Sequence, residues 1–182
     1  MTTFRIDPAH TDVAFSAKHM MVTRVRGKFT DVQGTVEFDP ADPTRARAEI
    51  VIAAASIDTG VAPRDAHLRS ADFLDAEQFP ELRISVISVQ PGRDGGYTLT
   101  ADATVRGVTR PVTLDAELLG EYASMQGARR IGIAARTTIN RKDWGLDWNV
   151  ALEAGGWLVG EKITFDIEVA AEEQAAQESA AA

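Results

Sequence analysis

The sequence contains no cysteine. Disulfide bonds and thiol chemistry are therefore excluded, while the redox compartment stays open. The patterns G-x-S-x-G, G-x-G-x-x-G, H-E-x-x-H and the P-loop are also missing. The sequence therefore lacks the usual signatures of serine hydrolases, nucleotide-binding enzymes and zinc peptidases. We expect no cofactor.

Positive charge is scarce. Nineteen Lys and Arg residues stand against 27 Asp and Glu, which gives a formal net charge of −8. Phosphate backbones and anionic membranes repel such a chain, so we expect no nucleic-acid partner. No apolar run is long enough to span a bilayer, so we expect no stable membrane insertion. The N-terminus MTTFRIDPAH lacks the basic and apolar regions of a secretory signal, which predicts a cytoplasmic location. If a signal peptide has been removed, a periplasmic or secreted location is expected instead.

Period-2 alternation dominates the chain. Apolar residues alternate with polar ones over residues 97–105, 112–118, 131–139 and 163–169. One apolar and one polar face is typical of half-buried antiparallel strands. Earlier segments alternate less regularly: Phe29 is out of phase with residues 32–38, and the phase slips again near Ile87. These slips predict a bulge or bend.

Short turn signals link the strands, including Asp94-Gly95-Gly96 and Arg106-Gly107. About eight strands in this order form either a sandwich or a closed barrel. We predict an all-β, closed antiparallel up-and-down barrel, because closure removes exposed edges and such a barrel can hold one small ligand. Small residues on the apolar faces, such as Ala101, Ala103 and Gly34, leave room inside.

Residues 61–78 break the alternation and predict short helices. Pro63 suits a first helical turn, and Asp65 and Arg69 stand four apart, so we expect them to pair on an exposed face. The insertion is long enough to cap an open barrel end. We predict that its charged residues, with His67, set its position against the barrel. The domain is expected to span residues 1–170, and the Ala/Glu-rich residues 171–182 to form a disordered tail.

The histidines are the remaining candidates for chemistry. Asp7, His10 and His19 could hold a metal, but Asp7 and His10 are expected on opposite faces of a strand, so we predict no metal site. His67 could act as a general acid or base, although a structural charge network is the preferred interpretation. Trp144 and Trp148 are expected to plug a barrel end and so to line its cavity.

Several motifs in register resemble those of the YceI-like family of lipocalin-like proteins associated with polyisoprenoid binding. They are IDPAH at 6–10, FSAKH at 15–19, VRGKF at 25–29, SIDTG at 56–60, RDAHLRSADFL at 64–74, RGVTRPV at 106–112 and NRKDWG at 140–145. The resemblance runs from about Ile6 to Val169. It implies an eight-stranded barrel with a helical segment at one end, an elongated apolar cavity for an isoprenoid-like amphiphile, and a homodimer.

Two functions stay open at this stage. The first is a non-enzymatic module that binds, stores or transports a long apolar ligand. The alternative is an enzyme or stress-response factor that acts on such a ligand through His, Arg and Asp groups at the barrel end. The absence of a nucleophile and of a metal constellation favours the first.

The predicted ligand-binding residues lie on the apolar strand faces or in the helical cap. Of these, His19 or Trp144 is expected to orient the head group near the mouth. The full set is Phe15, His19, Val36, Phe38, Ile52, Phe73, Ile84, Leu99, Ala101, Ile133 and Trp144. No catalytic or metal-ligating residue is assigned. Because each buried CH₂ contributes about 0.8 kcal/mol and a neutral hydrogen bond about 1 kcal/mol, we expect tail length to outweigh the head group in selectivity.

Overall fold

Four long strands in the second half of the chain follow the predicted alternation. They are β8 (Tyr97–Val105), β9 (Val108–Ala123), β10 (Arg129–Asn140) and β11 (Val159–Glu173). The computed structural model describes residues 1–123 and 127–174. Each strand pairs antiparallel with the next, for example Leu99 with Leu114 and Ala135 with Ile167. Ala101 and Ala103 are buried, whereas the hydroxyls of Thr104 and Thr109 bond to each other on the exposed face. The apolar face predicted from the alternation therefore points into the barrel, as expected.

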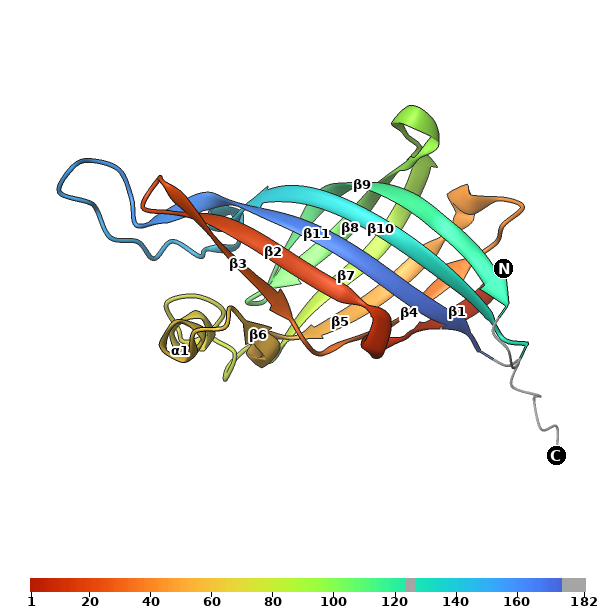
Figure 1. Ribbon diagram of the computed structural model, residues 1–182, viewed down its shortest axis with the longest axis horizontal. Helices are drawn as coiled ribbons and strands as arrows, with labels where there is room; N and C mark the ends of the chain where they lie inside the picture. The colour runs from red at the N-terminus through yellow and green to blue at the C-terminus, as the bar shows by residue number, and fades with distance from the viewer. Residues whose placement is uncertain (124–126, 175–182) are drawn as a thin grey trace.

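Four further strands complete the barrel: β1 (Thr2–Ile6), β4 (Val32–Phe38), β5 (Arg47–Ala53) and β7 (Glu81–Pro91). The order β1-β4-β5-β7-β8-β9-β10-β11 closes on itself because Phe4 of β1 pairs with Glu173 of β11. The predicted eight-stranded closed antiparallel barrel is confirmed (Figure 1). Ala171 is buried in β11, so the barrel extends three residues into the predicted tail. The disorder predicted for residues 175–182 lies outside the described residues.

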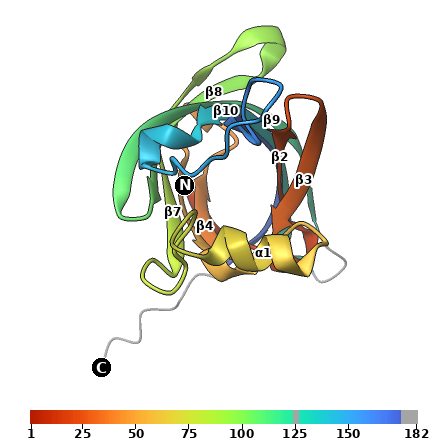
Figure 2. The ribbon, with the colours of Figure 1, turned by 90° about the vertical axis from the view of Figure 1, so that its left-hand side faces the viewer.

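The opposite end of the barrel is built differently. There β2 (Asp12–His19) takes the place of β1 beside β11, and β3 (Thr23–Phe29) pairs with β2. The sheet ends at β6 (Ile57–Asp58), which pairs with β3 over two residues. The wall therefore does not close here, and α1 (Ala62–Arg69) lies along one side of the open end (Figure 2). Of the residues 61–78 predicted as short helices, only this one helix forms, and turns follow it. No helix in the described ranges has both the length and the apolarity needed to cross a bilayer.

Both predicted irregularities are present. Phe29 ends β3 and Val32 begins β4, so Thr30 and Asp31 form a break at which the chain changes its strand partner. In β7 the register with β8 shifts between Val86 and Ser88, which leaves the Ile87 side chain 46% exposed. These breaks bend long strands around the barrel.

Gly34 does not enlarge the interior, contrary to our expectation. A Cβ atom built on Gly34 would lie 2.2 Å from the carbonyl oxygen of Glu49 and 3.0 Å from Cα of Ile50. The missing side chain therefore allows β5 to approach β4 closely, and it does not widen the cavity.

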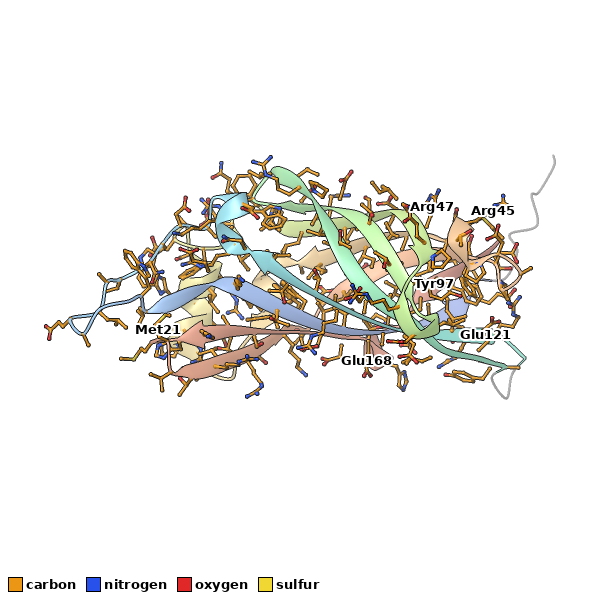
Figure 3. All side chains as sticks on the ribbon, turned by 90° about the horizontal axis from the view of Figure 1, so that it is seen from above. Met21, Arg45, Arg47, Tyr97, Glu121 and Glu168 are labelled. Carbon is orange, nitrogen blue, oxygen red and sulfur yellow. The ribbon has the colours of Figure 1, made fainter. Side chains whose placement is uncertain are left out.

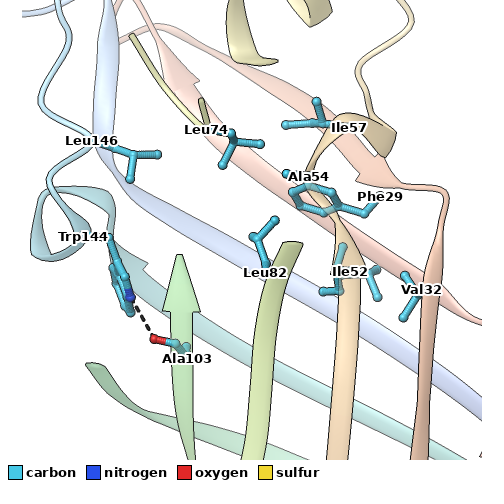
Figure 4. Close-up of a cluster of buried hydrophobic side chains, with 11 residues drawn as sticks. Phe29, Val32, Ile52, Ala54, Ile57, Leu74, Leu82, Ala103, Trp144 and Leu146 are labelled. Carbon is cyan, nitrogen blue, oxygen red and sulfur yellow. Dashed lines mark hydrogen bonds between the residues drawn. The ribbon is translucent and has the colours of Figure 1, made fainter. Parts of the chain in front are cut away.

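Two clusters of buried side chains fill parts of the barrel. Phe4, Val36, Phe38, Ile131 and Ala171 pack at the closed end. A larger cluster, which includes Phe29, Ile52, Leu82, Ala103 and Trp144, lies nearer the open end (Figure 4). The two clusters leave part of the barrel interior unoccupied by side chains. This space forms the candidate site.

Candidate functional site

One cavity lies at the open end of the barrel and has a volume of 430 Å³. Its walls come from β2, β3, β10 and β11, from α1 with the turn that follows it, and from the loop after β10. Phe15, Phe73, Trp144 and Trp148 supply aromatic surface. This volume is in the range of about 300–1,000 Å³ that small-molecule sites occupy. We call it the first cavity.

A second cavity of 140 Å³ lies toward the closed end. Its wall is almost wholly aliphatic and includes Ile52, Ile84, Leu99 and Ile133. Tyr97 and Arg47, which also line it, lie toward the opposite end of the molecule from Met21 at the tip of the β2–β3 hairpin (Figure 3). The two cavities therefore follow one another along the barrel axis.

Three phenylalanines mark the boundary between the cavities. Phe15, Phe29 and Phe165 line the first cavity, and the neighbouring inward residues Val13 and Ile167 line the second. The ring of Phe15 lies 5.7 Å from that of Phe29 and 6.2 Å from that of Phe165, measured between centroids. We call this group the aromatic constriction. A tail that reaches from one cavity into the other would run beside this group.

Charged residues attach α1 to the wall of the first cavity. Asp65 is only 6% exposed and accepts hydrogen bonds from the backbone N–H and the hydroxyl of Thr59. Arg64 donates to the hydroxyl and carbonyl oxygens of Thr59, and Arg69 donates to the carbonyl of Ile57 at 2.7 Å. The predicted exposed Asp65–Arg69 pair is therefore wrong, because the buried Asp65 bonds to Thr59 and the exposed Arg69 donates to Ile57, both in the segment before the helix. The predicted positioning role of these residues fits this network.

The pKa of Asp65 reflects these contacts. Burial raises the pKa of this carboxyl, but the Thr59 hydrogen bonds and the charges of Arg69 and Arg64 outweigh burial, so the pKa lies below its ordinary value of 3.8. Hydrogen bonds to a carboxylate favour its charged form. Asp65 is thus an ionised anchor in the buried network.

Two aromatic residues and a histidine form one wall of the first cavity. The ring of His67 lies edge-on 4.5 Å from Trp148 and 5.1 Å from Phe73, and its Nε2 is 2.8 Å from a carboxylate oxygen of Asp72. His67 is therefore held on both sides, in agreement with a structural charge network.

Trp144 cannot orient a head group as we expected. It is buried, and its Nε1–H already donates to the carbonyl of Ala103 at 3.0 Å (Figure 4). Trp144 therefore contributes only its apolar surface to the cavity. His19 lines the cavity and is half-buried, so its predicted contact with a head group stays a prediction.

Asp7 and His10 are closer than the sequence indicated. Both lie at the 3-10 turn of residues Pro8–His10, where Nδ1 of His10 is 2.8 Å from Oδ2 of Asp7. The prediction of opposite strand faces is wrong, because the turn folds the two side chains together. The hydrogen bond from His10 lowers the pKa of Asp7. Across residues 1–123 and 127–174, no three His, Asp or Glu side chains gather closely enough to hold a metal ion.

Ten of the eleven predicted ligand-binding residues line a cavity. The first cavity receives Phe15, His19, Phe73 and Trp144, and the second receives Val36, Phe38, Ile52, Ile84, Leu99 and Ile133. Ala101 lines neither, because it is fully buried in the packed wall between them. Contact between these residues and a ligand stays a prediction.

Among the basic groups of the first cavity, sequence reasoning named His19, Arg64 and His67 but missed Lys18 and, above all, Arg141. This residue follows β10 and starts a 3-10 turn that Asn140 caps and that Gly145 closes with a φ of 74°. The turn carries the Arg141 side chain inward, where it is 4% exposed. The pattern NRKDWG contains the capping Asn and the closing Gly, so the turn could be predicted from the sequence. The inward direction of the arginine side chain could not be predicted.

The comparisons with known proteins agree with this geometry. A family model described as YceI-like domain matches residues 4–171. A UPF0312 protein of Staphylococcus aureus is 34% identical over 167 residues, which cover 91% of this chain and 95% of that protein.

Solved structures share the barrel. A Campylobacter jejuni YCEI protein superposes with a TM-score of 0.74 at 28% identity, covering 87% of this chain and 90% of that one. BcnA of Burkholderia cenocepacia gives 0.77 at 21%, covering 91% and 98%. A polyisoprenoid binding domain from Saccharophagus degradans gives 0.67 at 16%, covering 96% and 100%. The last two likenesses concern the fold alone. With the family model and the staphylococcal relative spanning nearly the whole barrel, the chain belongs to the YceI-like family.

Proposed function

We propose that this protein binds one elongated apolar or amphiphilic molecule of isoprenoid type inside the barrel, and thereby stores or transports it. The observation that carries the proposal is the pair of apolar cavities in line along the barrel axis. Apolar walls favour apolar ligands because burial removes hydrocarbon surface from water. The Saccharophagus degradans barrel, a polyisoprenoid binding domain, supports the same ligand class.

A binding role fits the polar groups of the first cavity better than catalysis does. Arg64 donates to Thr59, and His67 contacts Asp72. Asp65, the buried carboxylate beside them, accepts two hydrogen bonds from Thr59 at Oδ1. A general base has to reach a substrate proton, and these groups already hold one another. The cytoplasmic location and the homodimer stay predictions.

Native mass spectrometry of the purified protein tests the proposal. The expected spectrum shows one added mass per chain, which disappears on denaturation and is recovered by organic extraction as an apolar molecule. If the protein is recovered empty, it should take up farnesol at a ratio of one to one. An empty protein that binds no isoprenoid alcohol or acid would refute the proposed function.

A further inference from the structure

Arg141 is an unusual side chain for an apolar barrel. Its Nε donates to the carbonyl of Gly160 at 3.0 Å, and Nη1 donates to the carbonyl of Leu146. Nη2 is buried and has no hydrogen-bond partner among the residues that the structure describes. None of the ion pairs found in residues 1–123 and 127–174 includes Arg141. The guanidinium is therefore buried, charged and incompletely satisfied.

Such an arrangement is energetically unfavourable by itself. Moving a charge out of water is unfavourable unless a counter-charge and hydrogen bonds compensate. Burial accordingly lowers the pKa of Arg141, and the more distant charges of Asp147 and Glu161 offset only part of the effect. Glu161 itself is paired with Lys142 at 2.7 Å. Arginine keeps its proton even when buried, so the positive charge remains in the wall.

The other ionisable residues of the first cavity are all basic in type. They are Lys18, His19, Arg64 and His67, and no Asp or Glu of the described residues lines this cavity. The bias is opposite to that of the whole chain, which carries a formal net charge of −8. The second cavity shows no such bias, since it has Arg47 and Glu117 in its wall. The positive character therefore belongs to the open end alone.

We propose that the first cavity binds the negatively charged head group of an amphiphile, a carboxylate or a phosphate, with Arg141 as its principal contact. This inference rests on the proposed function and adds the chemistry of the ligand's polar end. Planar guanidinium groups match the oxygen atoms of both anions, and hydrogen bonds between two charged partners are stronger than neutral ones.

The surroundings of Arg141 suit a head group with an apolar tail. Its guanidinium carbon lies 6.0 Å from the centroid of the Phe73 ring, which in turn is 5.3 Å from that of Trp148. The aromatic wall excludes water from the charge and strengthens its attraction for an anion. From there the tail would extend through the aromatic constriction toward the second cavity.

Three ligands with the same fifteen-carbon tail test this inference: farnesol, farnesoic acid and farnesyl phosphate. Their dissociation constants for the wild-type protein are measured by calorimetry at neutral pH. A charge-assisted hydrogen bond contributes about 1.5–3 kcal/mol, so at least one anion should bind roughly 10- to 100-fold more tightly than farnesol. The tighter of the two anions identifies the head group.

The Arg141→Gln variant should lose this preference while its affinity for farnesol stays within about threefold of the wild-type value. Arg136→Gln is the matched control, because Arg136 lies on β10, the strand that Arg141 follows, but is 66% exposed and pairs with Asp166 outside the barrel. The control should keep the full preference for the anion. If Arg141→Gln does not fold, ¹⁵N-arginine spectra of the wild type provide the second measurement: the anion, and not farnesol, should shift the Arg141 side-chain resonances.

The outcomes separate the two proposals. Equal affinities of the wild type for all three ligands would overturn the anionic head group and leave the apolar-binding function intact. Retention of the anion preference in Arg141→Gln would overturn the role of Arg141. Failure of all three ligands to bind would refute the proposed function itself.

Discussion

Asp65 is a buried carboxylate whose hydrogen-bond partner precedes its own helix. Sequence spacing paired it with Arg69 on the surface, because spacing within one helix is all that a helical pattern contains. Its actual partner, Thr59, lies in the extended segment before α1, and the contact depends on how that segment turns. Helix propensity predicted the element, but tertiary contacts decide which side of the helix is buried.

Replacing Asp65 by Ala should destabilise the protein. The N–H of Thr59 loses its acceptor and the two arginines lose a counter-charge, so the free energy of unfolding should fall by about 2–4 kcal/mol. Chemical denaturation followed by circular dichroism measures the change. Asp72→Ala is the control, because within the described part of the chain this exposed carboxylate pairs with His67 alone, and its loss should cost about 1 kcal/mol or less. Equal losses for both variants would contradict the anchoring role of Asp65.

The same residue predicts a pH dependence. The pKa of Asp65 is lowered in the folded protein, so its contribution to stability is present above the ordinary value of 3.8 and is lost as the pH falls through the lower, folded pKa. The stability advantage of the wild type over Asp65→Asn should therefore be constant above about pH 5 and shrink below about pH 4. Urea unfolding of both proteins across this range checks the sign. An advantage that grows in acid would contradict it.

Two small residues illustrate which property of a single residue could not be predicted from the sequence. Ala101 and Gly34 were both expected to leave room for a ligand, yet Ala101 is packed in the wall and Gly34 allows a close approach of two strands. Alternation gives the direction of a side chain. Whether space remains in front of it depends on residues across the barrel, and these come from distant parts of the sequence. Arg141 was missed for the same reason, since one of its acceptors, the carbonyl of Gly160, is nineteen residues away.

At the scale of elements, the strands themselves were well predicted. The alternation in residues 97–105 and 131–139 placed β8 and β10, and the slip at Ile87 marked a real change of register in β7. The two-residue β6 carried no readable pattern, because its place is set by its contact with β3. The aromatic constriction was also unpredictable, since Phe15, Phe29 and Phe165 come together only when β2, β3 and β11 pair.

The aromatic constriction should control how quickly a long tail enters. Phe15 packs over Gly27, where an added Cβ would lie 2.5 Å from the phenylalanine Cζ. Replacing Phe15 by Leu shortens one side of the passage and keeps it apolar, so the association rate of a long isoprenoid should rise several-fold. The rate for a short isoprenoid, which fits in the first cavity, should not change. Stopped-flow fluorescence measures both rates.

Phe73→Leu is the control for this experiment. Phe73 also lines the first cavity but lies on the wall beside His67, away from the boundary. It should leave the ratio of long-tail to short-tail rates unchanged. If Phe15→Leu alters neither rate, or alters both equally, the tail does not pass between the three phenylalanines.

At the scale of the whole molecule, the closed end and the open end of the barrel differ in structure and in chemistry. Pairing of β1 with β11 closes the wall around an aliphatic interior, while β2, β3 and α1 leave an opening beside aromatic and basic side chains. Such a shape suits a ligand that is apolar along its length and polar at one end. The barrel class followed from the sequence because the four long strands of the second half each carried one apolar face and short turns linked the strands. The division of the barrel interior into two cavities could not be predicted from the sequence.

A tail-length titration of a matched pair of variants tests whether one ligand tail occupies both cavities, as the proposed function requires. Ala135 faces the second cavity from β10, whereas its neighbour Ala134 does not line it. Dissociation constants are measured for isoprenoid alcohols of one to several units with the wild type, Ala135→Phe and Ala134→Phe. Each added unit buries five carbon atoms, worth about 3–4 kcal/mol before ordering costs. Affinity should rise with tail length in the wild type and in Ala134→Phe, but should stop rising in Ala135→Phe once the first cavity is full. Length dependence that is identical in all three proteins, or absent from all three, would contradict the occupation of both cavities by one tail.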